Sequence, residues 1–260
     1  MSILDAIIAT KKQEIISLPD IMPVKASGSS FIEAILGKQP ALIAEVKPKA
    51  PSSNQLLRTE DIPRFVRIFE RHAQAISVLC DRHYFGGGFD LLAQVRSLTN
   101  KPLLAKEFII STKQIDHAAQ NGADAILLIV AILEPPALAK LLTHAVALNL
   151  DILIEVHSRA EADKAACTFN LLSEEEKNRV LFGINNRNLR TLQTDLRTTE
   201  KLAPLINKRL PGVRGIITES GIHSREDIQL LQPLVQGFLI GTSILRANKP
   251  DVYLTSLFSS

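Results

Sequence analysis

The chain has 260 residues, of which 46% are hydrophobic and 22% charged, and its formal net charge is +3. This composition is typical of a folded globular protein and excludes a disordered chain. The chain has no run of five basic residues, no Trp and only two Tyr, so we expect no nucleic-acid partner.

The cysteines and the N-terminal segment indicate a cytoplasmic protein. Cys80 and Cys167 match no CxxC pair or zinc-ligand spacing, and both lie in apolar stretches, so we expect two buried free thiols in a reducing compartment. Residues 1–17 mix acids and lysines with apolar residues, unlike a signal peptide. The longest apolar run, Ala125–Leu133, is too short to span a membrane, so we expect no membrane contact.

Residues 1–40 are predicted to form a short helical extension. Leu4–Leu18 has the pattern of an amphipathic helix, and Ser30–Leu36 that of a shorter one. Pro19–Ser29, which contains proline and serine, connects them. We expect both helices to pack across one mouth of the domain that follows, or along its side.

Residues 41–260 contain eight short apolar runs with β-branched residues. Runs with so little polar alternation are typical of parallel strands that are buried on both faces. They begin about every 28 residues, the length of one βα unit. The predicted strands are Ala41–Val46, Ala75–Cys80, Pro102–Lys106, Ala125–Val130, Asp151–Val156, Leu181–Asn185, Gly215–Ser220 and Gly237–Gly241.

The segments between these strands have helical periodicity and helix start signals. In a capping box, a serine hydroxyl accepts from a free backbone N–H while an acid or amide three residues later bonds back to the cap. Gly122 is placed to end the helix after the third strand. The capping-box spacings are Ser111 with Gln114, Ser158 with Glu161, and Ser224 with Asp227.

Eight strands that alternate with helices permit a closed barrel or an open doubly wound sheet. The count of eight, and the absence of a GxGxxG turn after the first strand, favour the barrel. We therefore expect one α/β domain over residues 1–260: a (β/α)₈ TIM barrel over 41–260 with the N-terminal helical extension over 1–40. A chain of this length can bury a large core and needs no disulfide or metal for stability.

Charged and polar residues gather where the predicted strands end, which is where TIM barrels carry their chemistry. Glu45 and Lys47 share one strand face, as do Asn185 and Arg187, because side chains alternate along a strand. Charged strand ends are often surface ion pairs, but a buried cluster of this size is costly to desolvate, which favours a functional site. Its candidate members are Glu45, Lys47, Lys106, Glu155, Asn185, Arg187 and Glu219.

The ends of the last two strands favour phosphate binding. TIM barrels often hold phosphate with the loops after strands seven and eight and a short helix N-terminus. Ser220-Gly221 and Gly241-Thr242 lie at those positions, although glycines of this kind also occur in ordinary turns.

Gly86-Gly87-Gly88 follows Tyr84-Phe85 and lacks nucleotide-loop spacing, so it is either a flexible loop that brings an aromatic ring to the pocket or a plain hinge. No histidine lies in a metal-binding pattern, and we expect His157 and His223 to be hydrogen-bonded or solvated.

These strand ends resemble those of indole-3-glycerol-phosphate synthases. Residues 43–52, IAEVKPKAPS, are similar to the I-A-E-x-K-x-x-S-P-S motif of that family. The resemblance continues in order over about residues 40–246, and its most specific parts are the E-x-K opening and residues 183–189, GINNRNL. The other matching segments are 84–87, 106–109, 121–129, 154–156, 219–222 and 238–243.

The resemblance implies a carboxy-lyase of tryptophan biosynthesis that closes the indole ring of a small phosphorylated anilino-sugar without a cofactor or metal. It implies that Lys106 is the general acid and that Glu155 faces the developing cation or acts as base, leaving open which glutamate is the base. Glu45, Lys47 and Asn185 then position the substrate and assist proton transfers. The implied substrate contacts are Arg187, Glu219, Ser220, Phe85, Phe108, Leu128 and Ser52, with Lys47, Gly221, Gly241 and Thr242 at the phosphate.

The chain departs from the family at Ala50, where a serine usually holds the substrate carboxylate, so that Ser52 or Ser53 must replace the contact or it is lost. Thr242 stands where serine or glutamate is common, and the loop after the second strand is richer in glycine. The chain is short for a fusion with phosphoribosylanthranilate isomerase, so we expect a monofunctional monomer. Two alternatives remain: such an isomerase, using Cys80 and Asp81, or a barrel that binds the ligand without turnover.

Overall fold

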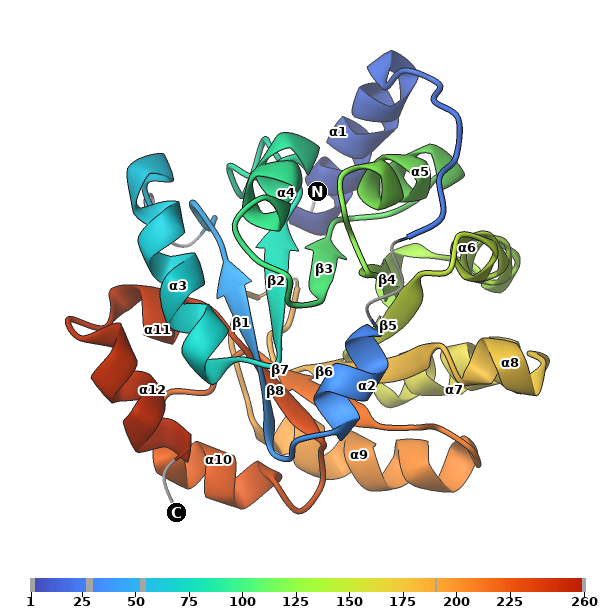
Figure 1. Ribbon diagram of the computed structural model, residues 1–260. Helices are drawn as coiled ribbons and strands as arrows, with labels where there is room; N and C mark the ends of the chain where they lie inside the picture. The colour runs from blue at the N-terminus through green and yellow to red at the C-terminus, as the bar shows by residue number, and fades with distance from the viewer. Residues whose placement is uncertain (1–2, 27–29, 52–54, 190, 259–260) are drawn as a thin grey trace.

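The computed structural model describes residues 3–26, 30–51, 55–189 and 191–258. Eight parallel strands close into a barrel in chain order, with β1 also paired to β8 (Figure 1). The predicted closed barrel is confirmed, and every predicted strand lies within one residue of an observed one at each end. The strands are β1 Ala41–Val46, β2 Ala75–Leu79, β3 Leu103–Lys106, β4 Ala125–Ile129, β5 Asp151–Val156, β6 Val180–Asn185, β7 Ile216–Glu219 and β8 Gly237–Ile240.

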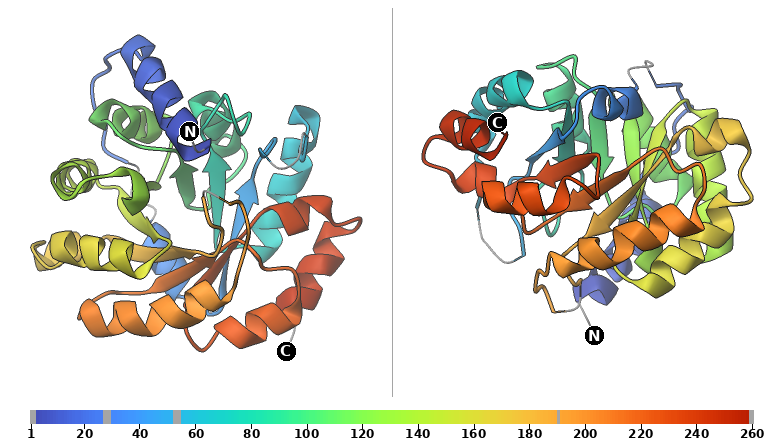
Figure 2. Two further views of the ribbon diagram at one scale, coloured as in Figure 1. Left: turned by 180° about the vertical axis from the view of Figure 1, so that it is seen from behind. Right: turned by 90° about the horizontal axis from the view of Figure 1, so that it is seen from below.

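Helices surround the barrel wall (Figure 2). Within the described ranges, none is long and apolar enough to cross a lipid bilayer. The α-helices are α1 Ile3–Ser17, α2 Phe31–Leu36, α3 Ile62–His72, α4 Phe89–Arg96, α5 Thr112–Gln120, α6 Pro135–Ala147, α7 Arg159–Phe169, α8 Glu174–Lys177, α9 Arg197–Arg209, α10 Arg225–Leu231, α11 Thr242–Arg246 and α12 Pro250–Phe258. Two short 3₁₀ helices are η1 Thr59–Asp61 and η2 Val130–Ile132.

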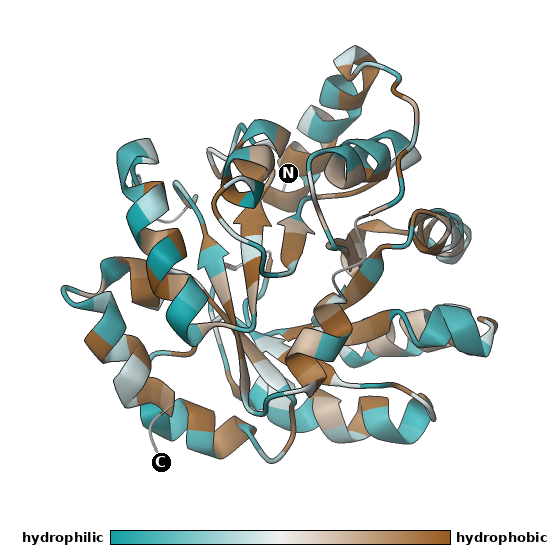
Figure 3. Ribbon diagram, viewed as in Figure 1, coloured by the Kyte–Doolittle hydropathy of each residue, from teal (hydrophilic) through white to brown (hydrophobic). Residues whose placement is uncertain are grey.

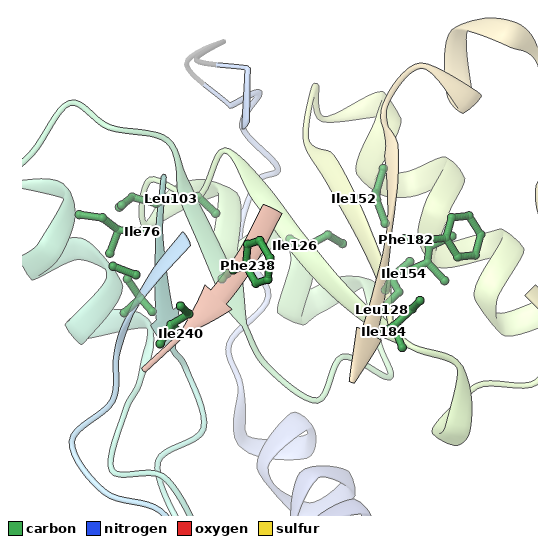
Figure 4. Close-up of a cluster of buried hydrophobic side chains, with 14 of the residues drawn as sticks. Ile76, Leu103, Ile126, Leu128, Ile152, Ile154, Phe182, Ile184, Phe238 and Ile240 are labelled. Atoms are coloured by element: carbon green, nitrogen blue, oxygen red, sulfur yellow. The ribbon is translucent and has the colours of Figure 1, made fainter. Parts of the chain in front are cut away.

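Two apolar cores lie on the two faces of the barrel wall, because successive strand side chains point in opposite directions. The outer core lies between strands and helices and includes Ile126, Leu128 and Phe182 (Figure 4). The inner core fills the barrel and includes Leu127 and Leu153. Because the strands are covered on both faces, their sequences are apolar with little polar alternation. Figure 3 shows these largely apolar strands beside helices with hydrophilic outer surfaces.

The helix start signals are confirmed with one difference. Ser111 and Ser224 form complete capping boxes, and Gly122 ends α5 with a φ of 89°. Ser158 caps α7 by accepting from the backbone N–H of Glu161. The Glu161 carboxylate, however, does not return to the cap backbone and instead accepts from the backbone N–H of His157.

The two helices of the N-terminal extension lie at opposite ends of the barrel (Figure 2, right). Phe31 of α2 packs into the inner core beside Ile43 at the amino end, whereas α1 lies over the carboxyl ends of the strands. The prediction that both helices share one location is therefore wrong. Residues 18–26 connect the two ends along the outer wall, where the Ala26 N–H donates to the Leu148 carbonyl at 2.8 Å.

The two cysteines have different environments. Cys80 is buried in the outer core, as predicted. Cys167 is exposed on α7, so the prediction of two buried thiols is wrong for this residue. Its neighbours Ala165, Ala166, Thr168 and Phe169 supply the buried face of that helix, and Cys167 falls on the other face.

Candidate active site

A cavity of about 390 Å³ lies at the carboxyl ends of the strands, under α1. It is the place at which barrel enzymes bind substrates. The structure brings most of the predicted site residues to this one cavity. Those that line it are Glu45, Lys47, Phe85, Lys106, Phe108, Glu155, Asn185, Arg187, Ser220, Gly221, Gly241 and Thr242.

One wall of the cavity is aromatic and apolar. The rings of Phe85 and Phe108 have centroids 6.0 Å apart and planes inclined by 34°, and Leu127 and Ile129 of β4 lie beside them. Leu128 lies outside this lining, in the outer core of Figure 4, so its predicted place against the substrate is wrong by one residue. Strand alternation turns Leu128 toward the helices.

Lys106 extends from the end of β3 into a group of carboxylates. Its Nζ lies 2.5 Å from Glu219 Oε2 and 3.6 Å from Glu45 Oε2. Burial alone lowers the pKa of Lys106, but the charges of Glu219, Glu45 and Glu155 outweigh burial and raise it. Lys106 therefore keeps its proton and can deliver it to a bound oxygen atom.

Glu155 lies near the carboxyl end of β5 and also lines the cavity. Its Oε2 accepts from the Asn185 amide at 3.0 Å, and its Oε1 lies 3.2 Å from Nε2 of His157. Burial opposes ionisation, yet the positive charge of His157 and Lys106 lowers the pKa of Glu155 to about 2. Glu155 is therefore a carboxylate that stays negative beside the cavity at neutral pH.

Glu219 lies beneath the cavity and not in its lining. Its predicted contact with substrate is therefore replaced by the ion pair with Lys106. A β-carbon at Gly183 would overlap Glu219 Oε1, so this glycine makes room for the carboxylate inside the barrel. Burial, only partly offset by Lys106, raises the pKa of Glu219 to about 7.

Glu45 and Lys47 share one face of the chain at the end of β1, as predicted, and form an ion pair. Burial raises the pKa of Glu45, but the positive charges of Lys47 and Lys106 lower it by more than burial raises it. The Glu45 carboxylate is therefore charged. A β-carbon on Gly241 would clash with the Glu45 side chain. Glycine at the end of β8 therefore leaves room for the Glu45 carboxylate of the neighbouring β1. We name Glu45, Lys47, Lys106, Glu155 and Glu219 the pocket cluster.

The loops after β7 and β8 form the side of the cavity that is suited to an anion. Ser220, Gly221, Gly241 and Thr242 line it, and Lys47 and Arg187 supply positive charge. Ser243 joins the two loops, since its hydroxyl donates to the Ile222 carbonyl at 2.9 Å. Ser52, also predicted to contact substrate, lies outside the described residues.

A second buried ion cluster lies under α1 and consists of Lys11, Asp81 and Glu107, which we name the anchor cluster. Lys11 is 1% exposed, and its Nζ lies 2.8 Å from Asp81 and 3.1 Å from Glu107. Asp81 also accepts from the backbone N–H groups of Tyr84 and Phe85 at 2.6 and 2.9 Å. The cluster therefore fixes both α1 and the loop that carries the Phe85 ring. This ring lines the cavity, so the aromatic part of the loop prediction is confirmed, and its flexibility stays a prediction.

Several residues of the site gave no signal that identified them in the sequence. Ile3, Leu4 and Ile7 of α1 line the cavity, as does Arg246. His223 lines it too and is exposed to solvent, in line with its prediction. In the part of the chain that the structure describes, no three His, Cys, Asp or Glu side chains gather in a way that suits a metal ion.

Residues 4–257 match the indole-3-glycerol phosphate synthase family. The chain belongs to this family. The resemblance that the strand ends indicated is therefore confirmed, and it extends into α1 and α12.

Members of the family from several bacteria align along most of the chain. The indole-3-glycerol phosphate synthase of Burkholderia vietnamiensis is 36% identical over 271 residues, covering 98% of each chain. That of Bordetella pertussis is 40% identical over 233 residues, covering 87% of this chain and 84% of its own. The tryptophan biosynthesis protein TrpCF of Vibrio parahaemolyticus is 37% identical, and the chain spans 44% of its length.

Solved structures with a similar fold share the barrel at low sequence identity. KGPDC from Streptococcus mutans superposes with a TM-score of 0.61 at 15% identity, covering 85% of this chain and 96% of its own. Tryptophan synthase subunit alpha from Legionella pneumophila superposes with a TM-score of 0.60 at 11% identity, covering 87% and 96%. These similarities concern the fold alone.

Proposed function

We propose that this protein is an indole-3-glycerol-phosphate synthase, a carboxy-lyase of tryptophan biosynthesis. It would convert 1-(2-carboxyphenylamino)-1-deoxyribulose 5-phosphate to indole-3-glycerol phosphate, carbon dioxide and water. The observation that carries the proposal is the arrangement of Lys106 and Glu155 over an apolar pocket, opposite loops suited to a phosphate. Family membership over residues 4–257 supports the same reaction.

Lys106 acts as the general acid in this proposal. An aromatic carbon of the substrate attacks the sugar carbonyl, and the carbonyl oxygen takes the Lys106 proton to become a hydroxyl group. The electrons come from the ring, so the anilino nitrogen becomes positive and needs a negative partner. Glu155 fits that role better than the role of a strong base, because its pKa is about 2.

Loss of carbon dioxide returns the electrons of the broken carbon–carbon bond to the ring system. The new hydroxyl group then takes a proton and leaves as water, while the neighbouring sugar carbon loses a proton to form the double bond that completes the indole. Glu45, Lys47 and Asn185 line the cavity where they position the substrate and assist these proton transfers. Glu219 does not line the cavity and acts through its ion pair with Lys106. Its pKa of about 7 suits proton exchange at neutral pH. No step requires a metal or an organic cofactor.

The remaining contacts follow from the shape and charge of the cavity. Phe85 and Phe108 pack against the anilino ring. Lys47 and Arg187 face the anionic groups, and Ser220, Gly221, Gly241 and Thr242 hold the phosphate. We further propose that the enzyme is a cytoplasmic monomer that acts on this small molecule and binds neither nucleic acid nor membrane.

The isomerase alternative lacks its acid–base pair at the cavity. Cys80 is buried in the outer core, and Asp81 is fully buried against Lys11. Neither side chain belongs to the cavity lining. The alternative of binding without turnover keeps one supporting observation, which is that Ala50 lines the cavity where the family usually has a serine.

Product fluorescence tests the proposal. The purified protein is mixed with the anilino-sugar phosphate, and indole formation is followed together with release of carbon dioxide in a one-to-one ratio. The same substrate without its phosphate is the control, and we expect its kcat/KM to be at least about 100-fold lower, because the phosphate contacts are lost. Tight binding without product would favour the binding protein, and neither binding nor product would end both proposals.

A further inference from the structure

His157 and Glu161 extend the site behind Glu155. Glu155 and His157 are two residues apart at the end of β5, so their side chains point to the same side. The imidazole is mostly buried, with 10% of its side chain exposed, and it lies outside the cavity lining. It is therefore placed to act on Glu155 and not on the substrate.

Both ring nitrogens of His157 face a carboxylate. Nε2 lies 3.2 Å from Glu155 Oε1, and Nδ1 lies 3.0 Å from Glu161 Oε2. The same Glu161 oxygen also accepts from the backbone N–H of His157 at 2.8 Å. One contact from the Glu161 carboxylate holds the ring and the other holds the backbone of the same residue. Nε2 has no hydrogen-bond partner and meets Glu155 as a charge contact.

Glu161 reaches His157 from the start of α7. In α5 and α10 the acid or amide of the capping box accepts from the backbone N–H of the cap residue and also from that of the residue before it. In α7 Glu161 keeps only the second of these backbone contacts, with His157, and its carboxylate also contacts the His157 ring. The carboxylate at this helix start therefore holds a side chain next to the active site.

The charges around this pair favour an imidazolium ion. Burial lowers the pKa of His157, but Glu155 and Glu161 raise it to about 10. Glu155 in turn faces Lys106 from β3, Asn185 from β6 and Glu219 from β7. Of its two cationic neighbours, Lys106 is also shared with Glu45 and Glu219, which leaves His157 as the cation with the closest contact to Glu155.

We propose that His157, held by Glu161, is a positioning residue that keeps the Glu155 carboxylate charged and directed into the cavity. This inference rests on the proposed function, because it gives a carboxylate of that reaction its orientation and its ionisation. Outer groups that orient a reacting side chain commonly change its activity about 10- to 100-fold. Here a cation positions a carboxylate through an ion pair.

The ionisation of Glu155 can be measured without turnover. Protein labelled with ¹³C at the glutamate carboxyl groups is titrated by NMR, and the Glu155 signal is assigned by its loss in Glu155→Gln. In His157→Gln the imidazolium charge is gone, so we expect the Glu155 pKa to rise by at least about one unit. An unchanged Glu155 titration in this variant would overturn the proposal.

The pH profile of kcat/KM gives the second measurement. A reaction that needs charged Glu155 loses activity as the pH falls through the pKa of that group, so a raised pKa moves the acid limb to higher pH. We expect the acid limb of kcat/KM in His157→Gln to move to higher pH by the same amount as the Glu155 pKa measured by NMR, at least about one unit. Glu161→Gln should shift the limb in the same direction by less, because the imidazole remains. An equal loss at all pH values would show a structural role only.

His144→Gln is the matched control. His144 also pairs with a carboxylate, Asp116, at 2.7 Å, but it joins two outer helices. We expect that variant to leave both the Glu155 titration and the pH profile unchanged. If the wild type forms no product, the proposed function fails while the NMR titration still tests the His157 contact. If His157→Gln does not fold, Glu161→Gln decides the question.

Discussion

The pocket cluster and the anchor cluster use the same chemical groups for different purposes. Each places lysine among buried carboxylates, Lys47 and Lys106 in the pocket cluster and Lys11 in the anchor cluster. Two consecutive residues of the chain, Lys106 and Glu107, belong to different clusters. The Lys106 side chain is 15% exposed toward the cavity, whereas Lys11 is 2% exposed beneath α1. The comparison teaches that access to a ligand, and not the kind of ion pair, separates a reactive cluster from a structural one.

The electrostatic similarity between the clusters is close. In each, surrounding carboxylates outweigh burial and raise the lysine pKa. In each, burial raises the pKa of one carboxyl group to about 7: Glu219 in the pocket cluster and Glu107 in the anchor cluster. A shifted pKa alone therefore does not identify the catalytic group in this protein.

Lys106→Met should have the largest effect, and it breaks the pocket cluster. We expect kcat to fall by about 1,000-fold, within the range for loss of a general acid, while the barrel remains folded. Indole fluorescence measures the rate, and circular dichroism follows the fold. Retained activity would contradict the role assigned to Lys106 and, with it, the distinction between the clusters.

Lys11→Met should break the anchor cluster and change stability more than chemistry. Removal of the cation leaves the buried Asp81 and Glu107 carboxylates without their positive partner, which costs about 3 kcal/mol. Urea unfolding measures that loss, with the exposed Lys12→Met as control. We also expect KM to rise, because α1 contributes Ile7 to the cavity, with kcat nearly unchanged.

The stability loss in Lys11→Met should depend on pH. The Glu107 carboxyl has a raised pKa in the folded protein, so its contribution is complete below its unfolded-state pKa and is lost as the pH rises through about 7. Without Lys11, burial and Asp81 raise that pKa further. The loss should therefore be larger at pH 8 than at pH 5.5, and a loss independent of pH would contradict the assignment of Glu107.

Ala50→Ser should have the smallest effect. It tests whether one added hydroxyl group in the cavity lining changes substrate binding and leaves stability unchanged. A hydroxyl there can donate to the substrate carboxylate, and one hydrogen bond is worth about 1 kcal/mol, or roughly a fivefold lower KM. Steady-state kinetics measures this change, with Ala50→Gly as the variant that lacks the hydroxyl. Urea unfolding should show little difference, since the group faces the cavity.

The barrel and most of its site could be predicted because their signals are local. Doubly buried strands read as apolar runs, and the charges at their ends mark the carboxyl face of the barrel. Leu128 shows the limit of this reading. When both faces of a strand are apolar, the sequence does not say which residues point inward, so Leu127 and Leu128 could not be distinguished.

The anchor cluster could not be predicted because its members are distant in sequence. Lys11 looks like one more charge on an amphipathic helix, and lysine is rarely buried without a specific partner. Its partner Glu107 is 96 residues away. The redirected Glu161 carboxylate was missed for another reason: the spacing of a capping box is the same whether the acid bonds to its cap or to the preceding residue.

The segment between the two extension helices limits how far α1, which covers the cavity, can move. Residues 18–26 are held to the outer wall by contacts of their own, including Asp20 with Lys113 at 2.7 Å and Ala26 with Leu148. If Lys11 left Asp81 and Glu107, α1 would stay attached beside its docking place, so its return is an intramolecular event at high effective concentration. Substrate entry could then proceed by detaching one helix, while α2 keeps the opposite end of the barrel closed.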